Sequence, residues 1–146
     1  MNLENLVGIS LQKVNPDISM IQRLLAAARR NINDAHVSEI SSENRFDAAY
    51  KAIMQLANLA LQANGYRTLT SKPGHHMTMI QSLTQTVGIE KNTVIVLDAL
   101  RKQRNVADYS GDIVPNSAVN ECIGQAEDLL LCINDWLKNN KPELLK

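Results

Sequence analysis

The 146-residue sequence contains only six glycines and two cysteines, and it lacks the short motifs that mark common catalytic sites. The glycines are scattered along the chain, so they cannot form the Gly-rich loop that cradles a phosphate. The sequence has no cysteine pair at zinc-site spacing, no His-Glu-x-x-His and no Gly-x-Ser-x-Gly. These absences exclude a Rossmann-type or P-loop enzyme, and we expect neither a cofactor nor a bound metal.

Long hydrophobic runs are also missing. No segment approaches the roughly 18 consecutive apolar residues of a membrane-spanning helix. The N-terminus has no basic stretch followed by an apolar one, as a signal peptide would. Cys122 and Cys132 fall in one predicted helix about 15 Å apart, which is too far for a mutual disulfide. We therefore expect a cytoplasmic protein in which both cysteines are reduced and line the core.

The chain carries no excess of either charge, with 15 basic and 15 acidic residues. A neutral chain lacks the overall basic field that drives non-specific nucleic-acid binding, although a local basic patch can still serve that purpose. The hydrophobic content of 45% is ordinary for a globular protein and is sufficient for a core. The sequence therefore predicts one domain over residues 1–146.

What the sequence does contain is helical periodicity, and no segment alternates as a β-strand would. It predicts an all-α fold, an antiparallel bundle of four to five main helices plus a short N-terminal one. Asn15 is a suitable N-cap with Pro16 at the first helical position. The main helices are expected over residues 16–37, 41–64, 75–87, 90–108 and 115–139. The remaining expectations are a weak helix at 2–13 within an N-terminal extension (1–14), a loop at 66–74 and a tail at 140–146.

Three of these helices carry an apolar stripe at helical spacing. The stripe of the first main helix consists of Ile18, Ile21, Leu25, Ala28, Ile32 and Ala35. That of the second consists of Phe46, Ala49, Tyr50, Ile53, Ala57, Ala60 and Leu61. The last helix has Val119, Cys122, Ala126, Leu129, Ile133 and Trp136, flanked by Ile123, Leu130 and Leu137. This last stripe is broader than one neighbouring helix requires, so we expect a homodimer.

Polar residues are concentrated at 98–109, which reads D-A-L-R-K-Q-R-N-V-A-D-Y. Asp98 with Lys102, and Arg104 with Asp108, have the spacing of ion pairs on a helix. Arg104 lies seven residues after Leu97, so its stem points toward the buried stripe and its guanidinium must extend outward or meet a carboxylate. The segment is either a solvated helix end or a phosphate site.

In the phosphate-site interpretation, the arginines would supply paired donors, with an amide and a phenol beside them. The candidates are Arg101, Arg104, Asn105, Asp108 and Tyr109, where Arg101 and Asp108 share a face. His75 and His76 form a second candidate, because they lie where a loop enters a helix. They are expected to serve as an acid, a base or a phosphate ligand, or else to be a solvent-exposed pair. Phe46 and Tyr50 are expected to be packing residues.

The chain resembles the HEPN superfamily of small helical bundles over residues 17–139. A first helix rich in Leu, Ala and Arg (21–30) precedes R-F-D-A-A-Y-K-A at 45–52, which looks like the family's aromatic and alanine-rich helix. The His75-His76 pair matches a position where many members carry a histidine. The segment L-R-K-Q-R-N-V-A-D-Y at 100–109 is similar to the Arg-Asn helix end of the family, its most diagnostic feature.

This resemblance implies a ribonuclease motif in which an arginine is followed, four to six residues later, by a histidine. In ribonuclease members two copies form one cleft, where the arginine holds the phosphate and the histidine acts at the ribose 2′-hydroxyl. Here Arg104 and Asn105 match, but Tyr109 stands in place of the histidine, and no histidine follows His76. A tyrosine with a pKa near 10 is a poor base at neutral pH.

The resemblance therefore favours a non-catalytic or weakly catalytic module that binds RNA, a nucleotide or a partner protein. That partner would be of the nucleotidyltransferase type, as in two-gene toxin–antitoxin pairs. One alternative is a divergent metal-independent ribonuclease toxin that uses Arg104, Asn105 and Tyr109, aided by His75 or His76. A second alternative is a structural or assembly bundle with no nucleic acid.

Overall fold

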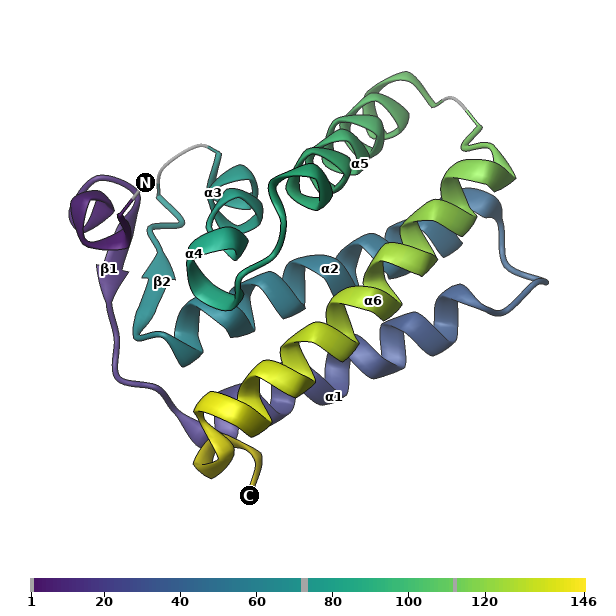
Figure 1. The fold of residues 1–146 in the computed structure, drawn as a ribbon. Coiled ribbons are helices and arrows are strands. Elements are labelled where there is room, and N and C mark those ends of the chain that lie inside the picture. Colours follow the sequence, from purple (N-terminus) through teal and green to yellow (C-terminus); the bar gives the residue numbers. More distant parts are fainter. Residues whose placement is uncertain (1, 72–73, 112) are drawn as a thin grey trace.

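The computed structural model describes residues 2–71, 74–111 and 113–146, apart from the side chains of Asp108 and Tyr109 (Figure 1). It confirms the predicted all-α bundle and adds a small two-stranded sheet. The helices are α1 (Ile18–Ala35), α2 (Ser42–Ala63), α3 (His75–Gln81), α4 (Leu83–Val87), α5 (Lys91–Ser110) and α6 (Asn116–Asn140). The remaining elements are the 3₁₀ helices η1 (Leu3–Leu6) and η2 (Pro142–Leu145) and the strands β1 (Leu11–Lys13) and β2 (Tyr66–Thr68).

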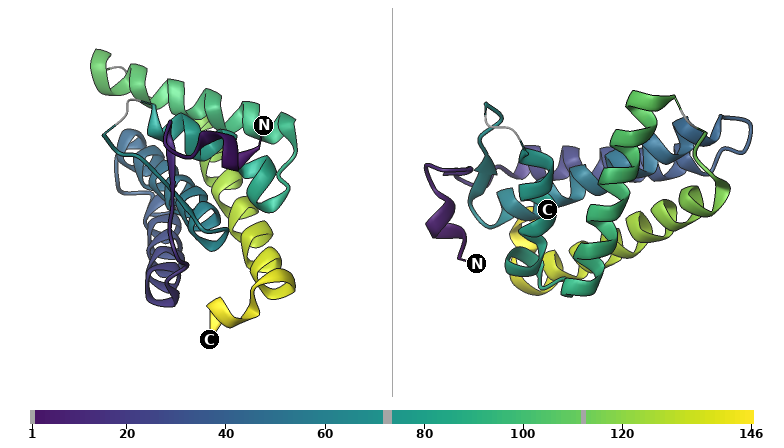
Figure 2. Two further views of the ribbon diagram at one scale, coloured as in Figure 1. Left: turned by 90° about the vertical axis from the view of Figure 1, so that its left-hand side faces the viewer. Right: turned by 90° about the horizontal axis from the view of Figure 1, so that it is seen from above.

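Helix α2 is the centre of the molecule. It packs against α1 and α6 along its length, while α3, α4 and α5 cover the side that faces away from α1 (Figures 1 and 2). The predicted stripe of α2 is confirmed, and further residues around the helix are also buried, including Leu56 and Leu59. Buried alanines such as Ala57 and Ala60 let the neighbouring helices approach closely. The position of α2 therefore decides where the other helices can pack.

Helix α1 begins two residues later than the sequence predicted. The N-cap is Asp17, not Asn15, because the Asp17 carboxylate accepts a hydrogen bond from the Ser19 N–H at 2.9 Å. Pro16 consequently lies before the helix. The apolar stripe of α1 is buried from Ile21 to Ala35, whereas Ile18 in the first turn is exposed.

The predictions of a helix over residues 2–13 and of a strand-free chain were wrong. Gly8 has a positive φ of 86°, which ends the helical region after η1. Strand β1 then pairs antiparallel with β2, so that Leu11 lies opposite Thr68. Each strand has three residues, too few to show the alternation by which a strand is detected. Part of the predicted loop at 66–74 is therefore β2.

The predicted helix over 75–87 is divided at Ser82 into α3 and α4. The buried Ser82 hydroxyl donates to the Met79 carbonyl at 2.8 Å, a local bond that competes with helix continuation. Gly88 ends α4 with a φ of 75°. The predicted tail also differs from expectation, because η2 packs on α1 and α6 and buries Leu144.

The two cysteines have different environments. Cys122 is buried as expected, and burial raises the pKa of its thiol to about 12. Cys132 is exposed, so the prediction that it lines the core was wrong. It lies next to Leu131 on the outer side of α6, just outside the buried stripe. No helix in the described part of the chain is long and apolar enough to cross a membrane.

Replacing Phe46 by alanine should destabilise the fold strongly. Phe46 is fully buried in α2, so its removal leaves a cavity and should lower the free energy of unfolding by about 3–5 kcal/mol. Ile95→Ala, at a side chain that is 66% exposed on α5, should change it by less than about 1 kcal/mol. Urea denaturation followed by circular dichroism measures both, and equal effects would contradict the burial of α2 described above.

Candidate functional site

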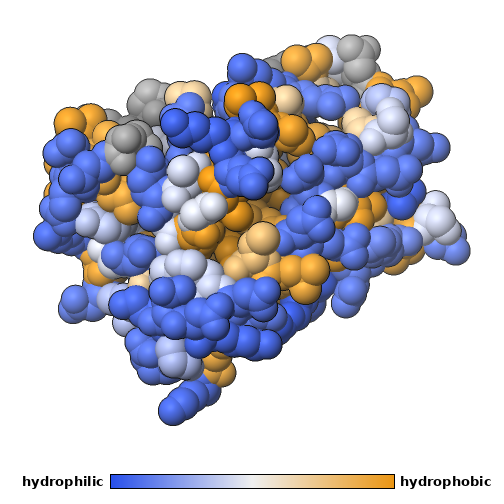
Figure 3. Space-filling model, in the orientation of Figure 1, coloured by the Kyte–Doolittle hydropathy of each residue, from blue (hydrophilic) through white to orange (hydrophobic). Residues whose placement is uncertain are grey.

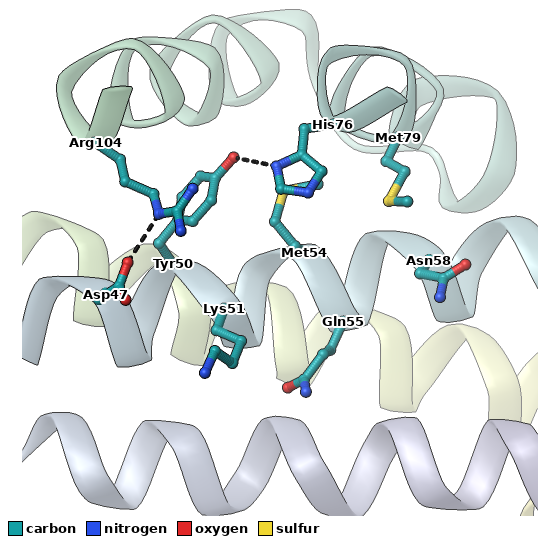
Figure 4. A pocket seen from close by; sticks show the side chains of 9 residues that line it. All are labelled: Asp47, Tyr50, Lys51, Met54, Gln55, Asn58, His76, Met79 and Arg104. Atoms are coloured by element: carbon teal, nitrogen blue, oxygen red, sulfur yellow. Dashed lines mark hydrogen bonds and ion pairs between the residues drawn. The ribbon is translucent and has the colours of Figure 1, made fainter. Parts of the chain in front are cut away.

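A cavity of about 320 Å³ lies between α2, α3 and α5 (Figure 4). Helix α2 supplies most of its lining from one face, where residues recur at spacings of three and four. His76 and Met79 come from α3, and Arg104 comes from α5. The residues from α2 are Asp47, Tyr50, Lys51, Met54, Gln55 and Asn58.

Arg104 is held in this cavity by two residues of α2. Its Nε donates to Asp47 Oδ1 at 2.8 Å, and its Cζ lies 5.1 Å from the centre of the Tyr50 ring. Both charged side chains are partly exposed, Arg104 by 30% and Asp47 by 43%. The expectation that Arg104 extends outward or meets a carboxylate is therefore confirmed, with Asp47 as the partner. The predicted Arg104–Asp108 pair lies outside the described residues.

Tyr50 and His76 form the second contact within the cavity. The Tyr50 hydroxyl and His76 Nδ1 share a hydrogen bond of 3.2 Å, whose direction depends on the histidine tautomer. Burial raises the pKa of Tyr50 to about 12, against the opposing influence of Arg104 and Arg101. Burial also lowers the pKa of His76, and His75, Arg104 and Arg101 lower it further. Both groups are therefore kept uncharged at neutral pH.

Arg101 lies one turn before Arg104 but outside the cavity lining. Its Nε donates to Asp98 Oδ1 at 2.8 Å, and Lys102 Nζ lies 3.5 Å from Asp98 Oδ2. The predicted Asp98–Lys102 pair is thus confirmed, and Arg101 joins it. Hydrogen bonding from Arg101, more than that from Lys102, lowers the pKa of Asp98. Arg101 therefore affects the cavity through its charge, which acts on Tyr50 and His76.

The other sequence candidates are separated by the fold. His75 does not line the cavity, but its ring lies edge-on to that of His76 with centroids 4.6 Å apart. Asn105 is exposed and also lies outside the lining. The side chains of Asp108 and Tyr109 belong to the part that is not described. Of the predicted residues, the structure therefore brings together Arg104 and His76.

Sequence reasoning missed the contribution of α2 to this site. Tyr50 is buried, as a packing residue should be, but its hydroxyl and ring also contact His76 and Arg104. Four other lining residues were not among the predicted site residues: Asp47, Lys51, Gln55 and Asn58. The available signal was their spacing of four, four and three, which places a polar stripe on a helix that is otherwise apolar.

Histidines outside the cavity do not form a second site. His36 is exposed, and its Nε2 lies 3.5 Å from Glu127 Oε1. Within residues 2–71, 74–111 and 113–146, no three histidine, cysteine, aspartate or glutamate side chains gather closely enough to hold a metal ion. The cavity is lined by two cations, one carboxylate, two amides, two thioethers and the rings of Tyr50 and His76.

Comparisons of the chain with known protein families, with curated proteins and with solved structures found no match.

Protonation of His76 should destabilise the folded chain in mild acid. The folded pKa of His76 lies below the ordinary value of about 6.5, so the unfolded chain binds more protons as the pH falls below that value. Stability is fully present above pH 6.5 and decreases as the pH approaches the folded pKa. Thermal melts should show that the wild type loses more stability from pH 7 to pH 5.5 than His76→Gln does. Equal losses of stability in the wild type and in His76→Gln would contradict the lowered pKa of His76.

Proposed function

We propose that this chain is a HEPN-like module that binds RNA or a nucleotide, with a phosphate at Arg104 in the cavity between α2, α3 and α5. The observation that carries this proposal is the placement of the Arg104 guanidinium by Asp47 and Tyr50 inside a cavity that also contains His76. A fixed guanidinium is well suited to a phosphate, because its N–H groups match the phosphate oxygens.

The composition of the cavity suits a nucleotide as a whole. Arg104 provides positive charge for the phosphate, and Lys51 adds a second cation at the boundary of the cavity. Met54 and Met79 provide an apolar wall for a base or ribose, and Gln55 is one of two amides that can hydrogen-bond to a base edge. The volume of about 320 Å³ lies at the lower end of the range of small-ligand sites.

Cleavage of RNA is the second candidate function, and the shared cavity of His76 and Arg104 supports it. A neutral His76 can take the proton of a ribose 2′-hydroxyl, whose oxygen attacks the phosphorus. The bond to the 5′-oxygen then breaks, leaving a 2′,3′-cyclic phosphate and, with a proton from water, a 5′-hydroxyl. Burial raises the pKa of Tyr50 to about 12, so its hydroxyl stays protonated at neutral pH and cannot accept this proton. His76 would therefore be the base.

The same resemblance leads us to propose a homodimer and a nucleotidyltransferase-type partner. Most of the α6 stripe is covered by the chain itself, but Leu131 is 64% exposed beside Cys132. Both lie in a groove of about 510 Å³ with Ile89 and Leu129. Figure 3 shows an apolar hollow near the middle of this face, between α6 and the segment that joins α4 to α5. A second copy could cover α6 at this groove.

Arg104→Ala should weaken the binding of a fluorescein-labelled single-stranded RNA at least about tenfold, equivalent to ~1.4 kcal/mol. The loss of one phosphate contact should also reduce the slope of log affinity against log salt by about 0.7. Lys102→Ala is the matched control, because it removes the same charge from α5 at a residue outside the cavity. Fluorescence anisotropy at several salt concentrations measures both effects, and equal affinities of the two variants would contradict the proposal.

The same samples, kept in EDTA and run on a gel, separate the competing functions. Cleavage by the wild type that is lost in both Arg104→Ala and His76→Ala would support the ribonuclease. Binding without cleavage would support the module. The absence of both would leave a structural or assembly bundle.

Replacing Leu131 by lysine tests the homodimer. A charge in place of this exposed leucine should oppose association while leaving the fold intact, because Leu131 contributes little to the core. Light scattering at micromolar concentration should give a dimer mass for the wild type and a monomer mass for Leu131→Lys. A wild-type monomer would contradict the proposed homodimer, and a dimeric variant would move the interface away from this groove.

A further inference from the structure

A second groove adjoins the cavity on the other side of α2. It has a volume of about 420 Å³ and lies between α1 and α2. Lys51 and Gln55 line both the cavity and this groove. Figure 4 shows these two side chains pointing from α2 toward α1, away from Arg104 and His76. The two hollows are therefore neighbouring parts of one surface, separated only by the side chains of α2.

The groove is polar and carries its own positive charge. Arg30 of α1 faces Lys51 of α2 across it, and in the described part of the chain neither cation forms an ion pair. Asp34 is the acidic residue of the lining. Asn31 Nδ2 donates to Gln55 Oε1 at 2.8 Å, which fixes the shared amide in place. Two cations without a partner face one carboxylate, so the groove favours an anion.

The spacing along α2 links this anion site to the one at Arg104. Arg104 is bonded to Asp47, and Lys51 follows Asp47 by one helical turn, a rise of about 6 Å. Lys51 points across α2, away from Arg104, so a phosphate at Lys51 would be a later one along the strand than the phosphate at Arg104. The amides of Asn31 and Gln55 can both donate to and accept from bases or ribose hydroxyls.

We propose that the groove between α1 and α2 is a second phosphate subsite, formed by Lys51 and Arg30. This inference rests on the proposed function of the cavity and specifies its ligand. The ligand is a single-stranded oligonucleotide that crosses α2, with one phosphate at Arg104 and a later one at Lys51 and Arg30. A mononucleotide occupies the cavity alone.

Arg30→Ala tests the subsite, and Arg29→Ala is its matched control. The two arginines are adjacent and exposed on α1, but Arg29 lines a groove on the α6 side instead. The probes are adenosine and uridine 5′-monophosphates and the corresponding 5′-phosphorylated tetranucleotides of RNA, measured by isothermal titration calorimetry at low salt. We expect Arg30→Ala to weaken tetranucleotide binding about three- to tenfold and to leave mononucleotide affinity unchanged. Arg29→Ala should change neither, and Arg104→Ala should weaken both.

The outcomes distinguish the subsite from the cavity. If tetranucleotides bind no more tightly than mononucleotides, and the Arg30→Ala and Arg29→Ala variants have equal affinity for them, the proposed subsite is wrong. The proposed function of the cavity still stands in that case. If no nucleotide binds to the wild type, both are wrong. If a hexaglutamate peptide binds as tightly as the tetranucleotide and is equally sensitive to Arg30→Ala, the groove recognises acidic protein segments. The proposal of an oligonucleotide ligand is then wrong. Thermal melts of each variant verify that it is folded.

Discussion

The burial of α2 is the constraint on which the rest of the structure depends. A helix with apolar residues on most of its surface must be covered from several directions, and α1, α6 and the α3–α5 segment together provide this cover. The polar stripe that begins at Asp47 is the exception, because its residues cannot be enclosed without partners. The cavity and the adjoining groove both follow this stripe, so the site lies where the packing of α2 is incomplete.

The contact between Arg104 and Asp47 is better understood as positioning than as stabilisation. Both side chains are partly exposed, and ion pairs of this kind contribute about 0–1 kcal/mol to stability. The contact nevertheless fixes the guanidinium relative to the ring of Tyr50, since two interactions restrict its orientation. The main effect of the pair is therefore to place a charge at the edge of the cavity.

The sequence predicted the long helices well because their information is local. Apolar spacing identified α1, α2 and α6, and glycines follow the ends of α2 and α4. The β1–β2 pairing could not be predicted, because it joins segments more than 50 residues apart through strands of three residues. The α3–α4 break was also missed, since it depends on one buried hydroxyl at Ser82.

The site was predicted only in part for a similar reason. Arg104 was identified from the helix that carries it, and the need for a carboxylate followed from its position after Leu97. Which carboxylate it meets depends on how α5 crosses α2, and that is a property of tertiary packing. The relation of His76 to Arg104 likewise requires α3 and α5 to lie on the same side of α2. A single sequence gives helical faces, but it does not give the angles at which the faces meet.

Burial shifts the pKa values of Tyr50 and His76 in opposite directions and has the same result for both. It raises the pKa of Tyr50 and lowers that of His76, so each side chain is kept in its neutral form. The positive charge of the cavity therefore comes from Arg104 and Lys51, with Asp47 as the opposing charge. An anion that enters meets the guanidinium of Arg104, which Asp47 and Tyr50 hold in place, and neutral hydrogen-bonding groups. This arrangement supports the proposed binding of a phosphate, which requires no proton transfer.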